Sequence, residues 1–450
     1  MPHPTDTIAA LATPVGTSAL AVVRASGPQT GELVQAIFCE GPLPREARHA
    51  DYRDAAGKLV DDVVFTWFAG PNSFTGEDTL EISSHGNPFI AQKILEDLLA
   101  RGCRPADPGE FSKRAFLNGR MDLSQAEAVM DLINARSERA LAAANQQLRG
   151  ALGRQMTELI TRLIAVLAQI EAYIDFPDED LPPEDRQSVL RELDGLLEGT
   201  NRLLATSHYG TLLRDGIKTV IIGEPNAGKS SLLNRLVGRE RALVSPEPGT
   251  TRDYLEERLQ LGGHWLRLID TAGLNPTAAA LEQRGIEKTL EQAAEADLFI
   301  WVIDTSAPLQ LLPPALAQRL SLQNTVAVLN KSDLPLKSTR ALPQGFVQVS
   351  LSALHGTGLD ALESALTILA DKFQTQIGED LIAINARHAA ALERARGGLE
   401  SAKRKLGDHV FSELVSSDLR DTMAAFGEIA GKIDNERMLD RLFASFCIGK

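Results

Sequence analysis

An eight-residue glycine loop between an apolar run and a helical pattern constrains the fold of this chain most. The loop is GEPNAGKS at residues 223–230, after the apolar run 219–222 and before the helical pattern 231–236. A strand, a glycine loop and a helix in this order form a phosphate-binding loop, whose backbone N–H groups and helix N-terminus face a phosphate. The sequence therefore predicts nucleotide binding, with Lys229 at the β- and γ-phosphates and the Ser230 hydroxyl on Mg²⁺.

Three further motifs follow in order, each after an apolar run. They are DTAG at 270–273, NKSD at 330–333 and SAL at 352–354. Asp270 can hold Mg²⁺ through water, and Gly273 lets a backbone N–H approach the γ-phosphate. Asp333 can accept both N–H donors of a guanine edge, which adenine cannot offer. Ser352 and Ala353 resemble the loop that touches guanine O6. Four such motifs at the C-terminal ends of strands predict GTP binding.

The residue after the DTAG motif suggests how GTP is hydrolysed. Leu274 stands where many small GTPases have a Gln that orients the attacking water. An apolar side chain cannot do this, so another group is needed. A monovalent cation held by Asn226 and carbonyls of residues 245–253 can neutralise charge between the β- and γ-phosphates. Thr251 is placed to bind Mg²⁺ and sense the γ-phosphate. The alternative is that Asn226 is only a turn former.

Length, charge and cysteine content bound the class of protein. A chain of 450 residues is too long for one core, which predicts about two to four domains. Its three widely spaced cysteines predict neither a disulfide framework nor a zinc site. Cys447 is a candidate reactive or structural thiol, but a cysteine at an apolar helix end is more often a small buried hydrophobe. No apolar stretch reaches transmembrane length, so the prediction is a cytoplasmic protein without membrane contact. A net charge of −14 argues against a large nonspecific nucleic-acid surface, but not against a local basic patch.

The pattern along the chain predicts a multidomain α/β fold. Residues 1–118 mix short strands (19–23, 62–68, 79–82) with a helix at 88–100, as in a small α+β domain. Helical spacing dominates 119–215 and returns in 374–450, on either side of a GTPase domain at 216–373. We infer one discontinuous all-α domain with a Ras-like P-loop domain inserted. Two independent helical hairpins are the alternative.

Several runs carry a resemblance to a known family over the full length. They are DTIAA with ATP at 6–14, PNSFTGED at 71–78, PGEFSKRAFLN at 108–118, the GTPase motifs, and the final FCIGK at 446–450. With these runs the chain resembles the tRNA modification GTPase family MnmE (TrmE). The resemblance implies an N-terminal folate-binding and dimerising domain, a discontinuous helical domain and an inserted GTPase domain.

The resemblance also implies partners and a reaction. A homodimer forms through the N-terminal domain, and a flavoprotein, MnmG (GidA), joins it in a heterotetramer. Together they add an aminomethyl or carboxymethylaminomethyl group to C5 of the wobble uridine of certain tRNAs. The one-carbon donor is 5-formyl- or 5,10-methylene-tetrahydrofolate, and GTP hydrolysis depends on potassium. The competing interpretation is a ribosome-assembly switch of the Era-like class, although we find no basic appendage beside the GTPase motifs.

Residue roles carried over from the resemblance complete the prediction. Glu282 positions the catalytic water. Mg²⁺ is bound by Ser230 and Thr251, and K⁺ by Asn226, Ser245, Glu247 and Thr250. The folate site uses Arg24, Glu81, Arg120 and Lys450. The predicted GTP-binding residues are Asn226, Ala227, Gly228, Lys229, Ser230, Ser231, Ser245, Glu247, Gly249, Thr250, Thr251, Asp270, Thr271, Ala272, Gly273, Asn330, Lys331, Asp333, Ser352 and Ala353.

Overall fold

The chain folds into two compact units. The structure is a computed structural model that describes residues 6–39, 41, 43–175, 183–240, 256–270, 290–308, 312–335, 345–375, 382–408, 412–431, 436–444 and 446–449. One unit comprises residues 1–130, 148–171 and 419–450, and the other comprises 131–147 and 172–418. The four domain ranges given by the sequence stay a prediction, because this division by contacts does not test them.

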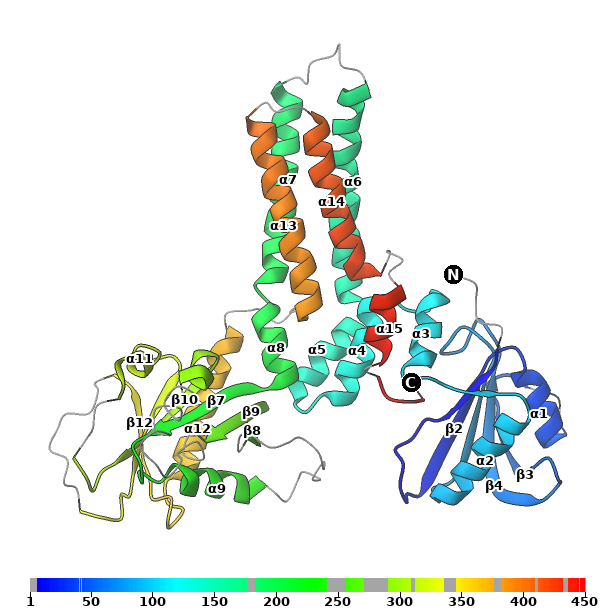
Figure 1. Cartoon of the computed structure of the whole chain (residues 1–450), viewed down its shortest axis with the longest axis horizontal. Helices are drawn as coiled ribbons and strands as arrows, with labels where there is room; N and C mark the ends of the chain where they lie inside the picture. Colours follow the sequence, from blue (N-terminus) through cyan, green and yellow to red (C-terminus); the bar gives the residue numbers. More distant parts are fainter. Residues whose placement is uncertain are drawn as a thin grey trace, which may run out of the picture. The chain divides into compact units, whose positions relative to one another are not determined.

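The first unit contains a six-stranded sheet with the order β3-β4-β5-β2-β1-β6 (Figure 1). Its strands are β1 (Ile8–Leu11), β2 (Leu20–Ser26), β3 (Ala47–Arg53), β4 (Leu59–Phe68), β5 (Thr79–His85) and β6 (Arg104–Pro105). Neighbouring strands are antiparallel, except that β1 and β6 are parallel. The helices α1 (Thr30–Phe38) and α2 (Pro88–Ala100) share one core with the strands, which includes Val23, Val34, Phe65, Ile82, Ile94 and Leu98. The predicted α+β mixture is confirmed.

Helix α2 begins where the sequence supplies a cap. The Asn87 side chain accepts a hydrogen bond of 2.9 Å from the backbone N–H of Phe89. Pro88 occupies the first helical position, where its missing N–H costs nothing. These local rules explain why the predicted bounds of this helix, residues 88–100, agree with the observed ones.

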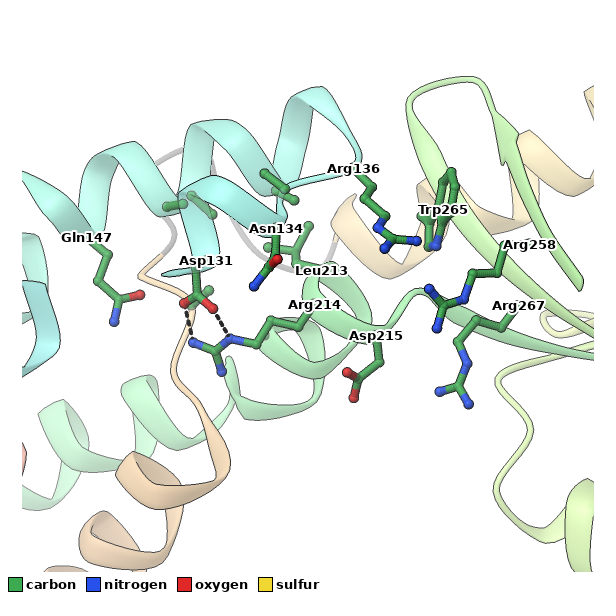
Figure 2. Close-up of a pocket in the computed structure, with 16 residues that line it drawn as sticks. Asp131, Asn134, Arg136, Gln147, Leu213, Arg214, Asp215, Arg258, Trp265 and Arg267 are labelled. Atoms are coloured by element: carbon green, nitrogen blue, oxygen red, sulfur yellow. Dashed lines mark hydrogen bonds and ion pairs between the residues drawn. The ribbon is translucent and has the colours of Figure 1, made fainter. Parts of the chain in front are cut away.

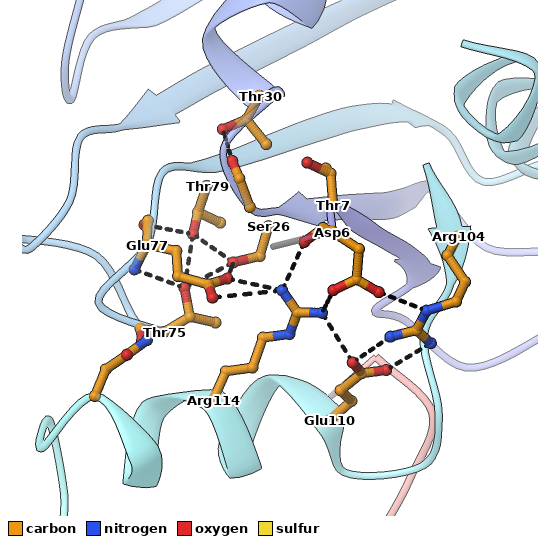
Figure 3. A network of polar contacts seen from close by, with 12 residues as sticks. Asp6, Thr7, Ser26, Thr30, Thr75, Glu77, Thr79, Arg104, Glu110 and Arg114 are labelled. Atoms are coloured by element: carbon orange, nitrogen blue, oxygen red, sulfur yellow. Dashed lines mark hydrogen bonds and ion pairs between the residues drawn. The ribbon is translucent and has the colours of Figure 1, made fainter. Parts of the chain in front are cut away.

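A buried ion network ties the start of the chain to helix α3 (Glu110–Leu117) in the same unit (Figure 3). Arg114 is 1% exposed and pairs with Asp6, Glu77 and Glu110 at 2.8, 3.1 and 2.9 Å. Arg104 bridges Asp6 and Glu110 at 2.8 and 2.6 Å. Although burial opposes it, the hydrogen bond from Arg104 lowers the pKa of both Asp6 and Glu110. The network therefore holds its charges because each is paired.

Helical residues from both ends of the chain pack together in the first unit. Leu123 and Ala126 of α4 (Leu123–Asn134) share a small core with Leu439 and Phe443 of α15 (Glu436–Ala444) and with Phe446. Arg420 of α14 (Ser412–Ala430) pairs with Glu171 of α6 (Ala151–Asp175) at 2.6 Å. Segments on either side of the GTPase motifs therefore meet.

The second unit repeats this arrangement with other helices. Helix α7 (Pro183–Leu204) packs along α13 (Ala386–Gly407), and Asp194 pairs with Lys403 between them. Helix α13 begins with a capping box, in which the Asn385 side chain accepts from the His388 N–H at 2.8 Å. Two further helices, α5 (Glu138–Leu148) and α8 (Ser207–Asp215), belong mainly or wholly to this unit. Among the described helices, none is long and apolar enough to cross a membrane.

The second unit also holds a six-stranded sheet in the order β12-β11-β10-β7-β9-β8 (Figure 1). Its strands are β7 (Ile217–Gly223), β8 (Glu256–Leu261), β9 (His264–Asp270), β10 (Leu298–Asp304), β11 (Thr325–Asn330) and β12 (Val347–Ser350). All neighbours are parallel except β8 and β9. Apolar cores cover both faces, and α9 (Lys229–Glu240) and α12 (Leu359–Thr375) contribute to one of them, while α11 (Pro314–Ala317) contributes to the other. The predicted α/β fold is confirmed.

Candidate functional site

The glycine loop lies between β7 and α9, as the sequence predicts. Gly228 has a φ of +96°, and a Cβ there would lie 2.2 Å from Nδ2 of Asn330. A Cβ on Gly223 would lie 2.2 Å from the carbonyl oxygen of Val302. Glycine is therefore required at both positions, because neighbouring strands approach the loop too closely for a side chain.

The Lys229 ammonium group is folded back onto the loop. Its Nζ donates to the carbonyl oxygens of Gly223 at 2.9 Å and Glu224 at 2.8 Å. The side chain is 5% exposed, and this burial lowers the pKa of Lys229. A phosphate anion in the loop would supply the charge partner that burial denies this group.

Ser230 and Asp270 bring magnesium-binding chemistry together. The Ser230 hydroxyl donates to Asp270 Oδ2 at 2.6 Å, and Asp270 is 1% exposed at the end of β9. A hydroxyl beside a carboxylate is the oxygen set that Mg²⁺ prefers beside a nucleotide. The residues present therefore fit the ion: Ser230 would ligate it directly, and Asp270 would hold it through water.

Asn330 connects the phosphate loop to the predicted guanine loop. It is 2% exposed, and its Nδ2 donates to the Ala227 carbonyl oxygen at 2.7 Å. Its Oδ1 accepts from the Ala353 N–H at 3.0 Å. Both functional groups of this amide are satisfied, which fixes two segments that are far apart in sequence.

The carboxylate of Asp333 interacts with the predicted guanine loop. A hydrogen bond from the Ser352 side chain lowers the pKa of Asp333. The group therefore stays an acceptor at neutral pH, as recognition of guanine donors requires. The structure thus brings four predicted residues together at this end of the sheet, namely Asn330, Asp333, Ser352 and Ala353.

Two residues of this site were not predicted. Arg235 of α9 donates from Nε to the Ala353 carbonyl oxygen at 3.1 Å and from Nη2 to the Leu354 carbonyl oxygen at 2.5 Å. Asp304, at the end of β10, accepts from Lys331 Nζ at 2.6 Å. Asp304 ends an apolar run, as Asp270 does, and this pattern was available in the sequence. Arg235 gave no such pattern, because its contacts depend on tertiary folding.

Ten predicted site residues lie outside the described residues. They are Ser245, Glu247, Gly249, Thr250, Thr251, Thr271, Ala272, Gly273, Glu282 and Lys450. Leu274 also lies there. Ser231 is described and is exposed on α9, one residue beyond the Ser230 hydroxyl.

A second polar site lies on the sheet of the first unit. Arg24 on β2 stands directly opposite Glu81 on β5. Nη2 and Nε of Arg24 donate to Glu81 Oε1 at 2.6 and 2.9 Å. The guanidinium carbon also lies 5.6 Å from the ring centroids of both Phe74 and Phe111. The expectation that Arg24 and Glu81 leave the sheet together therefore holds, and they neutralise each other.

The tail of the chain reaches this polar site. Arg24 Nη1 donates to the Gly449 carbonyl oxygen at 3.4 Å. Gly449 has a φ of +91°, and a Cβ there would lie 2.4 Å from the Leu11 carbonyl oxygen. Arg120 is exposed and packs against Gly76, on the loop that carries Phe74. Cys447 is exposed, so the expectation of a buried thiol was wrong; its neighbour Phe446 takes the buried place.

Comparison with known proteins gives concordant matches along the whole chain. A family model described as "GTP-binding protein TrmE N-terminus" matches residues 7–120, and one described as "MnmE helical domain" matches residues 123–447. The chain is 58% identical over 452 residues to the tRNA modification GTPase MnmE of Opitutus terrae, with 100% of both chains covered. It is 44% identical to that of Akkermansia muciniphila, again with 100% of both covered. For Chlorobium chlorochromatii the identity is 39%, covering 99% of this chain and 98% of the relative.

Proposed function

The chain belongs to the MnmE family of tRNA modification GTPases, and from this premise we propose what it does. It is a GTP hydrolase whose turnover serves the addition of an aminomethyl or carboxymethylaminomethyl group at C5 of the wobble uridine of certain tRNAs. The observation that carries the proposal is the described part of the nucleotide site, in which Asn330 joins the phosphate loop to the predicted guanine loop at 2.7 and 3.0 Å. A full-length match to tRNA modification GTPases does not favour the alternative of a ribosome-assembly switch.

In this proposal the predicted site residues hold the nucleotide, each in its own role, and all of those named here except Thr251 are among the described residues. Lys229 moves from the loop carbonyls to the β- and γ-phosphates. Ser230 and Thr251 ligate Mg²⁺, which would neutralise charge that develops on the phosphates. Asp333 selects guanine, while Asn330 and Arg235 hold the loops that shape the base pocket.

Hydrolysis is potassium-dependent in this proposal. Asn226, Ser245, Glu247 and Thr250 would hold the ion, and Glu282 would position the attacking water. Asn226 is exposed with a φ of +62°, so its side chain is not part of the core. The same φ fits a turn former. Equal GTP turnover in sodium and potassium buffers would decide for the turn former.

Glu282→Ala tests the water-positioning role. Loss of such a group should slow hydrolysis by about two to four powers of ten while GTP still binds. Turnover and GTP affinity are measured on the same preparation. Turnover near the parent value would make Glu282 an ordinary surface carboxylate.

The proposal that a folate donates the one-carbon unit rests on the polar site formed by Arg24, Glu81, Phe74 and Phe111, called the Arg24 site below. A tetrahydrofolate derivative offers a glutamyl carboxylate to Arg24 and pterin N–H donors to Glu81. Arg120 and Lys450 would complete the site. The existing Arg24–Glu81 pair supports this, because both partners already face one place beside two aromatic rings.

The proposed partners are a second copy of the chain through the N-terminal domain, the flavoprotein MnmG and the tRNA, in the cytoplasm. The test is mass spectrometry of wobble uridines from cells that lack this protein. The C5 group should be absent, and should return with the parent gene but not with Lys229→Ala. An unchanged nucleoside profile in the deleted cells would overturn the proposal.

A further inference from the structure

Asp304 ends β10 and is a largely buried acid to which the proposed function gives no role. Its side chain is 12% exposed, and it lies opposite Asn330 in the parallel register of β10 and β11. Parallel strands place their C-terminal ends at one edge of a sheet. Asp304 therefore puts a negative charge beside the NKSD motif at 330–333, which carries the predicted guanine contact.

The two carboxylate oxygens of Asp304 have separate partners. Oδ1 accepts from the backbone N–H and the hydroxyl of Ser306 at 2.8 and 2.6 Å. Oδ2 accepts from Nζ of Lys331 at 2.6 Å. Although burial opposes it, the hydrogen bonds from Lys331 and Ser306 lower the pKa of Asp304. The carboxylate is therefore ionised and fixed in direction, with one oxygen on the Lys331 ammonium group.

The backbone at Lys331 adopts an unusual conformation. Its φ is +63°, in the left-handed region that a residue with a side chain adopts only at a cost. Next to Asp304, Thr305 donates from its backbone N–H and its hydroxyl to the Asn330 carbonyl oxygen, at 3.2 and 2.9 Å. The end of β10 therefore holds both the backbone before Lys331 and the ammonium group of Lys331.

A second carboxylate lies close to this ammonium group. Asp333 follows Lys331 by two residues, and its side chain is 25% exposed. The hydrogen bond from Ser352 is the largest cause that lowers the pKa of Asp333, and the charge of Lys331 adds to it. Lys331 is thus close enough to act on Asp333, although within the described residues its ammonium group pairs with Asp304. Guanine recognition needs the Asp333 oxygens for the two N–H donors of the base.

We propose that Asp304 is a positioning residue for guanine recognition: it holds the ammonium group of Lys331 and so keeps Asp333 from being paired by its own neighbour. The inference rests on the proposed function, in which Asp333 selects guanine. A lysine carries its ammonium group on a flexible stem, so without Asp304 this group turns to the neighbouring carboxylate of Asp333. The new ion pair then has to break before the base can bind.

An ion pair elsewhere in the same unit offers a matched control. Asp131 of α4 accepts two hydrogen bonds from Arg214 of α8, at 2.7 and 2.6 Å, beside a cavity of about 490 Å³ (Figure 2). The Asp131 side chain is 22% exposed, and both residues lie outside the four nucleotide motifs. Asp131→Asn therefore removes the same charge from a similarly buried pair that joins two helices.

The test is calorimetric titration of the full-length chain with GDP, which probes the base site without hydrolysis. Asp304→Asn keeps the shape of the side chain but removes its charge, and should weaken GDP binding about fivefold. The effect is modest because Lys331 and Asp333, which would form the competing pair, are both partly exposed to solvent. Asp304→Glu keeps the charge and should recover part of the loss. Asp131→Asn should keep the parent affinity.

Two further backgrounds separate positioning from a purely structural role. Asp333→Asn, titrated with xanthosine diphosphate, has no carboxylate at position 333 to capture the ammonium group, so adding Asp304→Asn should leave its affinity unchanged. Lys331→Met has no ammonium group, so adding Asp304→Asn should leave its GDP affinity unchanged as well. A structural role would give the same loss in all three backgrounds, and that result would overturn the inference.

The remaining outcomes also decide. If Asp304→Asn binds GDP as tightly as the parent, Asp304 does not position this site. A parent chain that does not bind GDP would overturn the proposed function together with the inference. If Asp333→Asn does not bind xanthosine diphosphate, Asp333 does not select the base, and the inference fails while GTP hydrolysis by the chain still stands.

Discussion

The nucleotide site and the Arg24 site are assembled in different ways. The nucleotide site gathers Asp270 at the end of β9 and the loops that follow β7, β11 and β12, because parallel strands place their C-terminal ends at one edge of a sheet. The Arg24 site depends on the antiparallel register that sets Arg24 opposite Glu81, and on Gly449, which is 425 residues away along the chain. The first is built from loops and the second from strand pairing and tail docking.

The two sites also differ in how they hold charge without a ligand. Within the described part of the chain, Lys229 is buried and its hydrogen bonds go to two backbone carbonyls, so a phosphate gives it an anionic partner within hydrogen-bond distance. Arg24 already has a carboxylate partner, so a folate carboxylate must compete with Glu81. We therefore expect the nucleotide site to gain more per contact from its ligand than the Arg24 site does.

The scaffold of the first unit gives the largest expected effect. Arg114→Met removes the buried partner of three carboxylates, of which Asp6 and Glu110 keep Arg104 and Glu77 loses its described arginine partner, and this should cost about 3 kcal/mol of local stability. Hydrogen exchange of β1 and β2 should speed up, while GTP affinity in the other unit stays unchanged. Arg53→Met, at an exposed pair on the same sheet, is the control. If hydrogen exchange in Arg114→Met is as slow as in the parent, the ion network does not stabilise this sheet.

The second-largest expected effect is on the predicted guanine contact of Asp333. Asp333→Asn loses the charged acceptor and should weaken GTP binding by about ten- to a hundredfold. It should gain affinity for xanthosine triphosphate, whose 2-oxo group accepts from the new amide. Competition binding measures both, and Ser332→Ala, at the exposed neighbouring position, is the control. Retained guanine selectivity would show that the base lies elsewhere.

The Arg24 site should respond more weakly, because its charges are paired beforehand. Arg24→Ala and Glu81→Ala should each weaken 5-formyltetrahydrofolate binding by about tenfold or more. Calorimetric titration of the full-length chain gives the values, with Arg53→Ala as the control. If both variants bind as tightly as the parent, the folate site is not at this pair, and the comparison of the two sites fails.

The smallest effect concerns loop positioning. Arg235→Ala removes two hydrogen bonds to the carbonyl oxygens of the guanine loop and should weaken GTP and GDP equally, by about fivefold. Arg235→Lys should recover part of the loss, because it keeps the charge but not the forked geometry. A loss confined to GTP would instead indicate a role at the γ-phosphate.

The difference between a site built from loops at strand ends and a site built from long-range contacts also explains what the sequence can predict. The strands at 219–222, 266–269 and 325–329, with their terminal motifs, followed from local patterns, and the structure places Asn330 and Ser230 accordingly. Arg235 and the approach of Gly449 to Arg24 did not follow, because they need contacts between segments far apart in sequence. The folate residues came from resemblance alone. The prediction that Cys447 is buried failed because helical spacing at the chain end does not tell which neighbouring residue is buried.

A reconstituted reaction tests the central claim most directly, namely that both sites serve one tRNA modification. The full-length chain, the flavoprotein, unmodified tRNA, GTP, 5,10-methylene-tetrahydrofolate and an amine donor are combined in potassium buffer, and the wobble uridine is analysed by mass spectrometry. The amine is ammonium for an aminomethyl product or glycine for a carboxymethylaminomethyl product, because the folate supplies only the one-carbon unit. We predict the C5 group with the parent chain, and its loss or strong reduction with either Lys229→Ala or Arg24→Ala. Full modification by either variant would contradict the account.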